Sequence, residues 1–227
     1  DDDGNDWQQI LDDSFIMETG VGYAATHTNL GIFPNSGLLY TFNGPFNNGI
    51  IEVPIYRNDS ELEDTNWNFI GNPYPSAISA SEFLNANTNL DPNIPDADRS
   101  INGAIYLWSH HTAVSSNANG NEPLNYSSSD YAIINGVDGI AGGDGIVPNG
   151  FIPSGQGFFV AMSNSSPASS PPNIVSAKVT FNNSMRKRTI GSNSTFFRNS
   201  NSLINKIRLN LSSDLGVFSQ IVIAFIH

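Results

Sequence analysis

Residues 66–78 are Asn-Trp-Asn-Phe-Ile-Gly-Asn-Pro-Tyr-Pro-Ser-Ala-Ile, and residues 152–160 are Ile-Pro-Ser-Gly-Gln-Gly-Phe-Phe-Val. Each segment joins a short aromatic and β-branched run to a corner rich in proline and glycine. Such runs favour strands, and such corners favour the turns at the rim of an antiparallel sheet. The two segments therefore indicate an architecture more than a chemistry.

Strand-like runs separated by turn residues fill most of the remaining sequence. Residues 38–44 and 49–56 flank an Asn-Gly step at 48–49 and predict a β-hairpin. Ser79, followed three residues later by Glu82, predicts the N-terminus of one short helix. Further strands are expected at 15–26, 67–70, 103–108, 131–134, 152–162, 175–181, 195–197, 206–211 and 220–227. The strand at 131–134 is expected to pair with the strand at 103–108, and the polar residues 115–130 between them are expected to form an exposed loop.

This pattern predicts an all-β protein, an antiparallel β-sandwich or jelly roll with at most one short helix. We expect residues 1–14, which carry an acidic run, to form a linker and residues 15–227 to form a single β-sandwich domain. The last residues have the composition of a strand with no turn after it. We therefore expect the domain to continue beyond the C-terminus of this fragment.

The composition excludes several classes of function. Nine basic and 21 acidic residues give a net charge of −12, which repels nucleic acid. No run of apolar residues is long enough for insertion into a membrane. The chain has no cysteine, so a disulfide framework, a thiolate zinc site and a cysteine nucleophile are ruled out. Its polarity comes mainly from Asn, Ser, Thr and Gly, which suits an exported β protein.

No catalytic residue is expected. His110 and His111 are neighbours, and neighbours on a strand point to opposite faces, so they are poorly placed to chelate one metal ion. Ser154 lacks the Gly-x-Ser-x-Gly context of a nucleophile and is interpreted as a turn serine. The acids of residues 61–64 include a possible carboxylate pair for glycoside hydrolysis, but their polar loop favours simple solvation.

Asp138 and Asp144 are the candidate metal ligands. They lie in a glycine-dense segment, where carboxylates and backbone carbonyls can surround a hard cation such as calcium. The segment matches neither the nonapeptide calcium repeat nor the helix-loop-helix calcium loop. A structural Ca²⁺ is therefore the one cofactor considered, and solvated loop carboxylates are the alternative.

Trp108, Tyr126 and Tyr131 are the candidate ligand-binding residues. Sugar rings pack their CH faces on Trp or Tyr, while Asn and Asp bind the sugar hydroxyls. The competing interpretation places Trp67 and Trp108 inside the core as inward strand residues. On that interpretation only loop aromatics would serve a glycan.

Five segments together resemble a module found in large surface proteins of Bacteroidota, namely residues 67–78, 104–108, 152–160, 181–186 and 207–211. Proteins that carry this module are typically exported by the type IX secretion system, and the module commonly precedes the C-terminal sorting domain. The resemblance implies an extracellular location on the outer cell surface and neighbouring domains in a parent protein. It implies no catalytic residue.

These observations predict a non-catalytic, extracellular structural or adhesion module of a larger secreted or cell-surface protein. The alternative is a carbohydrate-binding accessory module of a polysaccharide-degrading enzyme, and a glycoside hydrolase domain is the third possibility. The expected partners are a polysaccharide or cell-surface glycan and the neighbouring domains of the parent protein.

Overall fold

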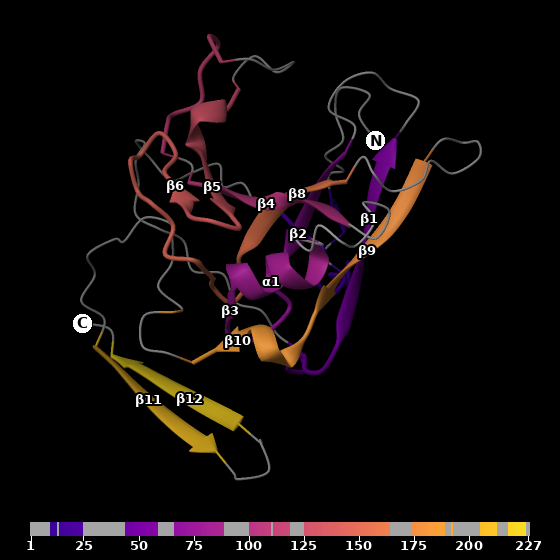
Figure 1. The fold of residues 1–227 in the computed structure, drawn as a ribbon. Helices are drawn as coiled ribbons and strands as arrows, with labels where there is room; N and C mark the ends of the chain where they lie inside the picture. The colour runs from indigo at the N-terminus through magenta and orange to yellow at the C-terminus, as the bar shows by residue number, and fades with distance from the viewer. Residues whose placement is uncertain are drawn as a thin grey trace. The chain divides into compact units, whose positions relative to one another are not determined.

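A computed structural model shows the fold of the chain (Figure 1). It describes residues 10–12, 14–24, 44–58, 66–88, 100–109, 111–118, 125–163, 174–188 and 192, and the strands at 205–212 and 218–225. The chain divides into two compact units, residues 1–197 and residues 198–227. Each unit is described by itself.

The largest element of the first unit is a five-stranded antiparallel sheet with the strand order β2-β8-β4-β5-β6. Its strands are β2 (Trp67–Gly71), β4 (Ile101–Trp108), β5 (Tyr131–Asn135), β6 (Gly139–Ile140) and β8 (Gly157–Met162). The strand predicted at 67–70, its end at the Gly-Asn-Pro corner and the predicted pairing of 103–108 with 131–134 are all confirmed.

Two smaller antiparallel sheets complete the first unit. One pairs β1 (Ile51–Asn58) with β9 (Ile174–Phe181), and the other has the order β10-β3-β7. The strands of the latter are β3 (Ala77–Ser79), β7 (Phe151–Ile152) and β10 (Arg186–Lys187). Within the described residues β1 has β9 as its only partner, so Pro54 lies on an edge strand, as its missing N–H requires.

One α-helix, α1 (Ala80–Asn87), is present in the described part of the chain, and its predicted N-cap is confirmed. The Ser79 hydroxyl accepts a hydrogen bond from the Glu82 backbone N–H at 3.3 Å. The Glu82 carboxylate forms an ion pair with Lys187 of β10 at 2.6 Å. At the last residue of the helix, the Asn87 side chain donates to the Thr180 carbonyl of β9 and accepts from the Thr180 N–H, which ties the helix to this strand.

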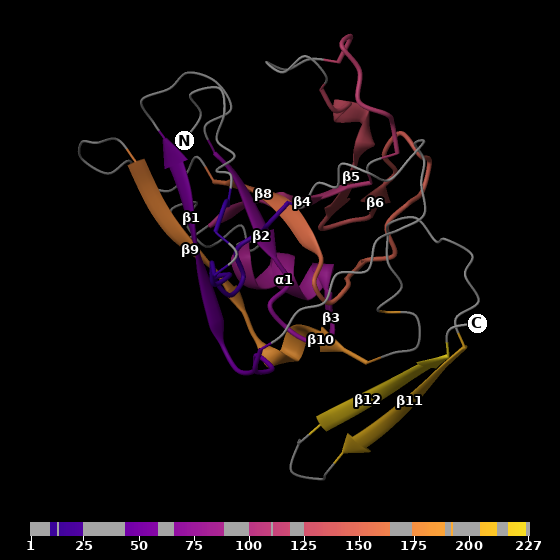
Figure 2. The same cartoon turned by 180° about the vertical axis from the view of Figure 1, so that it is seen from behind.

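The core lies between the five-stranded sheet, α1 and the β1–β9 pair, and Figure 2 shows the same arrangement from behind. Phe83 on α1 is in edge contact with Phe158 on β8 at a centroid distance of 5.4 Å and packs on Phe181 of β9 at 4.9 Å. All three rings are fully buried. Burial of such a side chain contributes about 1.5–3 kcal/mol, so these contacts hold the helix on the sheet.

The two proline- and glycine-rich corners meet at Asn72. Its side-chain amide donates to the carbonyl oxygens of Ser76, Ile152 and Pro153 at 2.9–3.0 Å, and its oxygen accepts from the Tyr74 N–H. Asn72 thereby satisfies buried backbone groups of both corners, which turns cannot pair by themselves. The two segments that stand out in the sequence are therefore neighbours in the fold.

Some predicted strands are wrong. Residues 152–162 do not form one strand, because Gly155 turns the chain at a φ of +73° and places β7 and β8 in different sheets. Residues 15–24 form only an isolated bridge between Val21 and Ile70, and Gly20 has a φ of +85°. Residues 38–43 of the predicted hairpin, residues 195–197 and the acids at 61–64 lie outside the described residues.

The second unit holds β11 (Asn205–Ser212) and β12 (Phe218–Phe225), which pair antiparallel. They confirm the two strands predicted near the end of the sequence. Antiparallel sheets with one α-helix confirm the all-β class for the described residues. The sandwich or jelly-roll arrangement and the single domain over 15–227 stay predictions.

Candidate functional site

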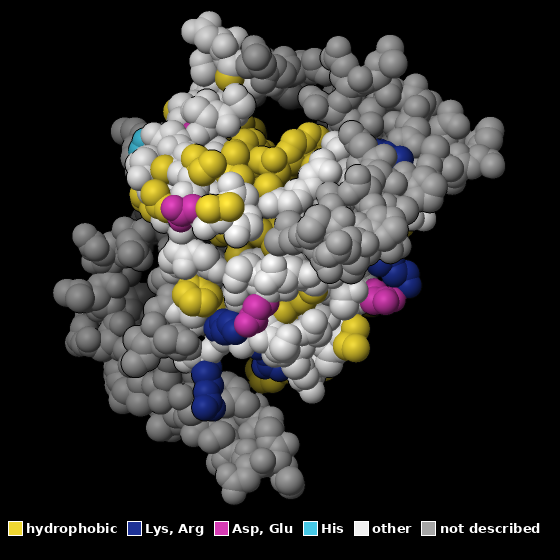
Figure 3. All heavy atoms as spheres, viewed as in Figure 1, with side chains coloured by type: hydrophobic (Ala, Val, Ile, Leu, Met, Phe, Trp, Pro, Cys, Tyr) yellow, Lys and Arg dark blue, Asp and Glu magenta, His cyan; other side chains and the backbone are white. Residues whose placement is uncertain are grey.

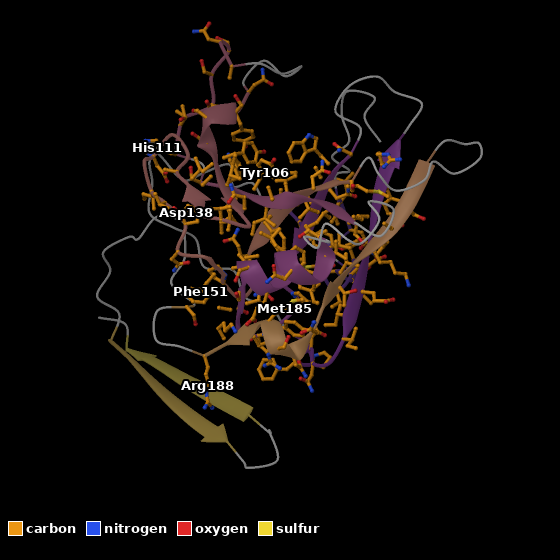
Figure 4. The ribbon with its side chains drawn as sticks, in the orientation of Figure 1. Tyr106, His111, Asp138, Phe151, Met185 and Arg188 are labelled. Atoms are coloured by element: carbon orange, nitrogen blue, oxygen red, sulfur yellow. The ribbon has the colours of Figure 1, made fainter. Side chains whose placement is uncertain are left out.

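The five-stranded sheet has two apolar faces, and only one of them faces the core. On β4, Ile105 and Leu107 are fully buried against the core. Tyr106 and Trp108 alternate with them, because successive side chains of a strand point to opposite faces. Tyr106 lies on the side of β4 that is turned away from α1 (Figure 4).

The outward side of β2, β8, β4 and β5 carries a set of aromatic side chains that we call the aromatic face. The strand register places Phe69 of β2 opposite Phe159 of β8, and Phe159 opposite Tyr106 of β4. Trp108 is opposite Tyr131 of β5. The aromatic face consists of Trp67, Phe69, Tyr106, Trp108, Tyr131 and Phe159.

Ring contacts connect the members of the aromatic face in pairs. Trp67 meets Tyr106 edge-on at a centroid distance of 4.7 Å, and Tyr131 meets Phe159 at 5.7 Å. Phe159 also packs against Phe69 at 4.6 Å. Aromatic pairs at these distances stabilise one another by about 0.5–1.5 kcal/mol beyond their burial, so the rings are held in defined positions.

These positions correct the prediction that Trp67 and Trp108 fill the core. Trp67 is 43% exposed, and Trp108 is partly buried on the face opposite to the core residue Leu107. Hydrophobic side chains gather on the upper part of the molecule in Figure 3, over the region where Figure 1 shows β4, β5 and β8. Trp67 is therefore exposed, and the other five members of the aromatic face are partly exposed.

A hollow of about 510 Å³ borders the aromatic face where β5 begins, and we call it the Tyr126 hollow. Tyr126 is 45% exposed, and its ring meets Trp108 edge-on at 4.7 Å. The lining combines two tyrosines with amide and hydroxyl side chains and consists of Asn117, Ala118, Asn125, Tyr126, Ser127, Ser128 and Tyr131. The structure thus brings Trp108, Tyr126 and Tyr131 together, as the sugar-binding hypothesis requires.

Sequence reasoning missed the polar part of this lining. Asn117, Asn125, Ser127 and Ser128 belong to the excursion that follows β4, which carries no periodic pattern. Two backbone hydrogen bonds between Ser115 and Asn125, at 2.9 and 3.0 Å, bring its ends together. The spacing of residues in the sequence does not predict such a bridge. The many Asn and Ser residues of the segment indicate only that the segment is polar.

Asp130 lies in the chain next to Tyr131 of the lining, and its burial was not predicted. Its carboxylate accepts hydrogen bonds from the Thr112 N–H at 2.8 Å and the Thr112 hydroxyl at 2.6 Å. Its backbone carbonyl accepts from the N–H and hydroxyl of Ser109. The sequence assigned Asp130 to an exposed loop, but it is fully buried because it ties the end of β4 to the start of β5.

No side chain that lines the Tyr126 hollow, among the residues the structure describes, is ionisable except the two tyrosines. Burial raises the pKa of Tyr131, and the nearby Asp130 carboxylate raises the pKa further. The phenol of Tyr131 therefore stays neutral at physiological pH. The hollow presents uncharged rings, amides and hydroxyls to solvent.

A second hollow, of about 250 Å³, lies beside β1, β2 and the segment 14–24. Its lining is mainly aliphatic and aromatic and includes Val21, Val53, Phe69 and Ile70, with Glu18 as its one acid. It lacks the serines and most of the amides of the Tyr126 hollow. The Tyr126 hollow is therefore the better candidate for a polar ligand.

The other candidates have local roles. The Ser154 hydroxyl donates to the Tyr74 carbonyl at 2.9 Å in the turn between β7 and β8, which confirms the turn interpretation. His111 is exposed, and His110 lies outside the described residues. No helix of the described chain is long and apolar enough to span a membrane.

Asp138 and Asp144 each bond to nearby backbone. Asp138 accepts from the Gly139 N–H at 2.7 Å and Asp144 from the Ile146 N–H at 2.9 Å. In the part of the chain that the structure describes, no group of three or more His, Cys, Asp or Glu side chains is placed to hold a metal ion. Calcium binding at this segment stays a prediction.

A family model described as a domain of unknown function, DUF8693, matches residues 2–227. The match covers nearly the whole chain, so the chain belongs to this family. The comparisons with curated proteins and with solved structures give no match.

Proposed function

We propose that this chain is a non-catalytic, extracellular binding module of a larger exported protein, and that it binds a neutral polysaccharide at the Tyr126 hollow. The observation that carries the proposal is the meeting of exposed aromatic rings with amide and hydroxyl side chains in one hollow. The proposed extracellular location rests on the resemblance to surface modules of Bacteroidota. The proposal combines the two functions predicted from the sequence, a structural or adhesion module and a carbohydrate-binding module, because binding to a glycan is one way to adhere.

The chemistry of the lining fits a sugar. A pyranose presents a CH face that packs on an aromatic ring and a rim of hydroxyls that need hydrogen-bond partners. Tyr126 offers an exposed ring, and its edge contact with Trp108 limits the movement of that ring. Asn117, Ser127 and Ser128 stand on the polar side of the same hollow.

The charge pattern favours a neutral glycan. The chain has a net charge of −12, which repels acidic polysaccharides at long range. The lining of the hollow holds neither the arginine nor the lysine that recognition of a carboxylate or sulfate would use. An uncharged glycan meets no such barrier.

The same lining supports a binding role over hydrolysis. Most glycosidases need two carboxyl groups on opposite sides of the scissile bond. No Asp or Glu is among the residues that line the hollow, and the nearest one along the chain, Asp130, is buried and accepts hydrogen bonds from Thr112. Binding without turnover is what such a surface can do.

Affinity electrophoresis tests the proposal. The chain is run in gels that contain xylan, glucomannan, laminarin or starch, with pectin and alginate as acidic comparisons. We expect retardation by at least one neutral polysaccharide and by neither acidic one. Tyr126→Ala and Trp108→Ala should each weaken binding about tenfold, which corresponds to about 1.4 kcal/mol.

The matched control is Tyr56→Ala, because Tyr56 is 50% exposed but lies on β1 and not on the aromatic face. It should leave the retardation unchanged. No retardation by any of the four neutral polysaccharides, or an equal loss in the Tyr56 and Tyr126 variants, would contradict the proposal.

A further inference from the structure

We infer that the ligand is an internal stretch of a polysaccharide chain, which continues from the Tyr126 hollow across the aromatic face to Trp67. This inference rests on the proposed function and adds the form of the ligand. The alternative within the same function is a single sugar or a chain end held in the hollow alone.

The aromatic face adjoins the hollow. Tyr131 belongs to both, since it lines the hollow and its ring meets Phe159 on β8. Trp108 meets Tyr126, the most exposed aromatic of the lining. A chain seated on Tyr126 therefore reaches further aromatic rings without crossing a polar rim.

The aromatic face is wider than one sugar ring. From β5 to β2 the sheet order contains three steps between neighbouring strands, through β4 and β8. At roughly 4.8 Å for each step, the distance is about 14 Å. A single pyranose covers about the area of one tyrosine ring, so the face offers room for several sugar units side by side.

The far end of the face is at Trp67 of β2, whose side chain is 43% exposed. Residues 20–22 lie along β2, where the Gly22 N–H donates to the Phe69 carbonyl and the Gly71 N–H donates to the Gly20 carbonyl, so these hydrogen bonds fall on the Gly71 side of Trp67. Trp67 lies opposite Ala161 of β8, so the position beside it carries only a methyl group. A polysaccharide chain can leave the face beside the exposed Trp67. A site for a single sugar does not need such an exit.

The absence of charged side chains from the outward positions of the face favours the same ligand as the hollow does, a neutral polysaccharide. None of the outward positions on these four strands carries an ionisable group other than tyrosine; they are Trp67, Phe69, Gly71, Ala104, Tyr106, Trp108, Tyr131, Ile133, Asn135, Gly157, Phe159 and Ala161. An apolar patch of this extent on a soluble protein marks an interaction surface. A neutral polysaccharide fits its rings, and its hydroxyls fit the amides and serines at one end.

Calorimetry with oligosaccharides of different length tests the inference. The fragments have two and six sugar units and come from xylan, glucomannan, laminarin and starch. We expect six units to bind at least tenfold more tightly than two units of the same polysaccharide. Trp67→Ala should abolish this advantage and leave the affinity for two units unchanged, whereas Tyr126→Ala should weaken both.

The control is Phe46→Ala, which removes an aromatic that is 74% exposed and lies outside the aromatic face. It should change neither affinity, and unchanged binding of two units by Trp67→Ala shows that this variant is folded. Equal affinity of the wild-type chain for both lengths would overturn the inference and leave the glycan site in the hollow. An equal loss for both lengths in Trp67→Ala would do the same.

If no fragment of any of the four polysaccharides binds, both the inference and the proposed function fail. A protein partner is the other possible occupant of such a face. Sedimentation experiments test this occupant. If the wild-type chain dimerises with increasing concentration and Trp67→Ala does not, the face belongs to a second copy of this chain and the inference is overturned.

Discussion

Both faces of the five-stranded sheet carry apolar side chains, but only the inner face belongs to the core. The inner face presents Ile105, Leu107 and Phe158, which are fully buried against α1 and β9. The outer face presents Tyr106, Phe159 and other aromatics that are only partly covered. The side chains of the inner face are close-packed in the core, whereas the rings of the outer face meet mostly edge-on and border the polar lining of the Tyr126 hollow.

This difference teaches that apolar character alone does not locate the core of this protein. Residues 157–162 are Gly-Phe-Phe-Val-Ala-Met, a run without alternation between polar and apolar residues. Such a run is typical of a strand that is buried on both faces. Here one face is buried by the helix and the other remains at the surface, where we propose that a polysaccharide covers it.

The largest expected effect is a difference in stability between alanine variants of two adjacent phenylalanines, one on each face of the sheet. Phe158→Ala removes a fully buried ring that touches Phe83 and should lower the free energy of unfolding by about 3–5 kcal/mol. Phe159→Ala removes a partly exposed ring of the outer face and should cost only about 1–2 kcal/mol. Urea denaturation of both variants measures the difference, and equal losses would mean that the two faces are equally buried.

Asn72→Ala should have the next largest effect. The substitution leaves buried carbonyls of both corners and the Tyr74 N–H without the partner that Asn72 provides, at a cost of about 2–3 kcal/mol. The loss should appear in thermal unfolding, while polysaccharide binding at temperatures where the variant is folded stays the same. A variant as stable as the wild type would show that the hydrogen bonds of Asn72 do not stabilise the two corners.

Ser79→Ala tests the helix that covers the inner face. Loss of the N-cap hydrogen bond to the Glu82 N–H should cost about 1 kcal/mol. Asn85→Ala is the matched control at an exposed position of the same helix, and it should not lower the stability because alanine favours a helix interior. If both substitutions cost the same in chemical denaturation, the cap does not contribute to stability.

The smallest expected effect is a dependence of stability on alkaline pH. Burial raises the pKa of Tyr131 in the folded chain, so the folded state holds the phenolic proton more tightly than the unfolded state. Stability from this source is complete below the unfolded pKa of about 10 and is lost as pH rises through the folded value. In melting curves between about pH 8 and about pH 11, Tyr131→Phe should lose less stability than the wild type. A parallel decline in both proteins would place Tyr131 in water.

Local signals in the sequence were sufficient for much of the fold. The Ser79 cap and the strand before the Gly-Asn-Pro corner follow from neighbouring residues. The pairing of β4 with β5 follows from two successive apolar runs, although residues 109–130 separate them. The pairing of β1 with β9 joins residues more than a hundred positions apart, and no local pattern specifies it. The single strand predicted over 152–162 failed because Gly155 was interpreted as an interruption within a strand and not as a turn between sheets.

The candidate site was predictable only where the type of a single residue was informative. Trp108, Tyr126 and Tyr131 were suggested by residue type, and the structure brings them together. Which face of β4 is turned outward could not be predicted, because Ile105 and Leu107 are as apolar as Tyr106 and Trp108. The amide and hydroxyl side chains of the hollow are positioned by the Ser115–Asn125 bridge and by Asp130, which are contacts of the folded chain.

A titration followed by two-dimensional ¹H–¹⁵N and ¹H–¹³C NMR tests the separation of the two faces most directly. The probe is the six-unit fragment of the polysaccharide that retards the chain in gels. We predict that the indole N–H signals of Trp67 and Trp108 shift together on addition of the fragment, while the methyl signals of Ile105 and Leu107 on the opposite face of the sheet stay in place. Shifts at the inner methyl groups with unchanged indole signals would contradict a polysaccharide site on the outer face.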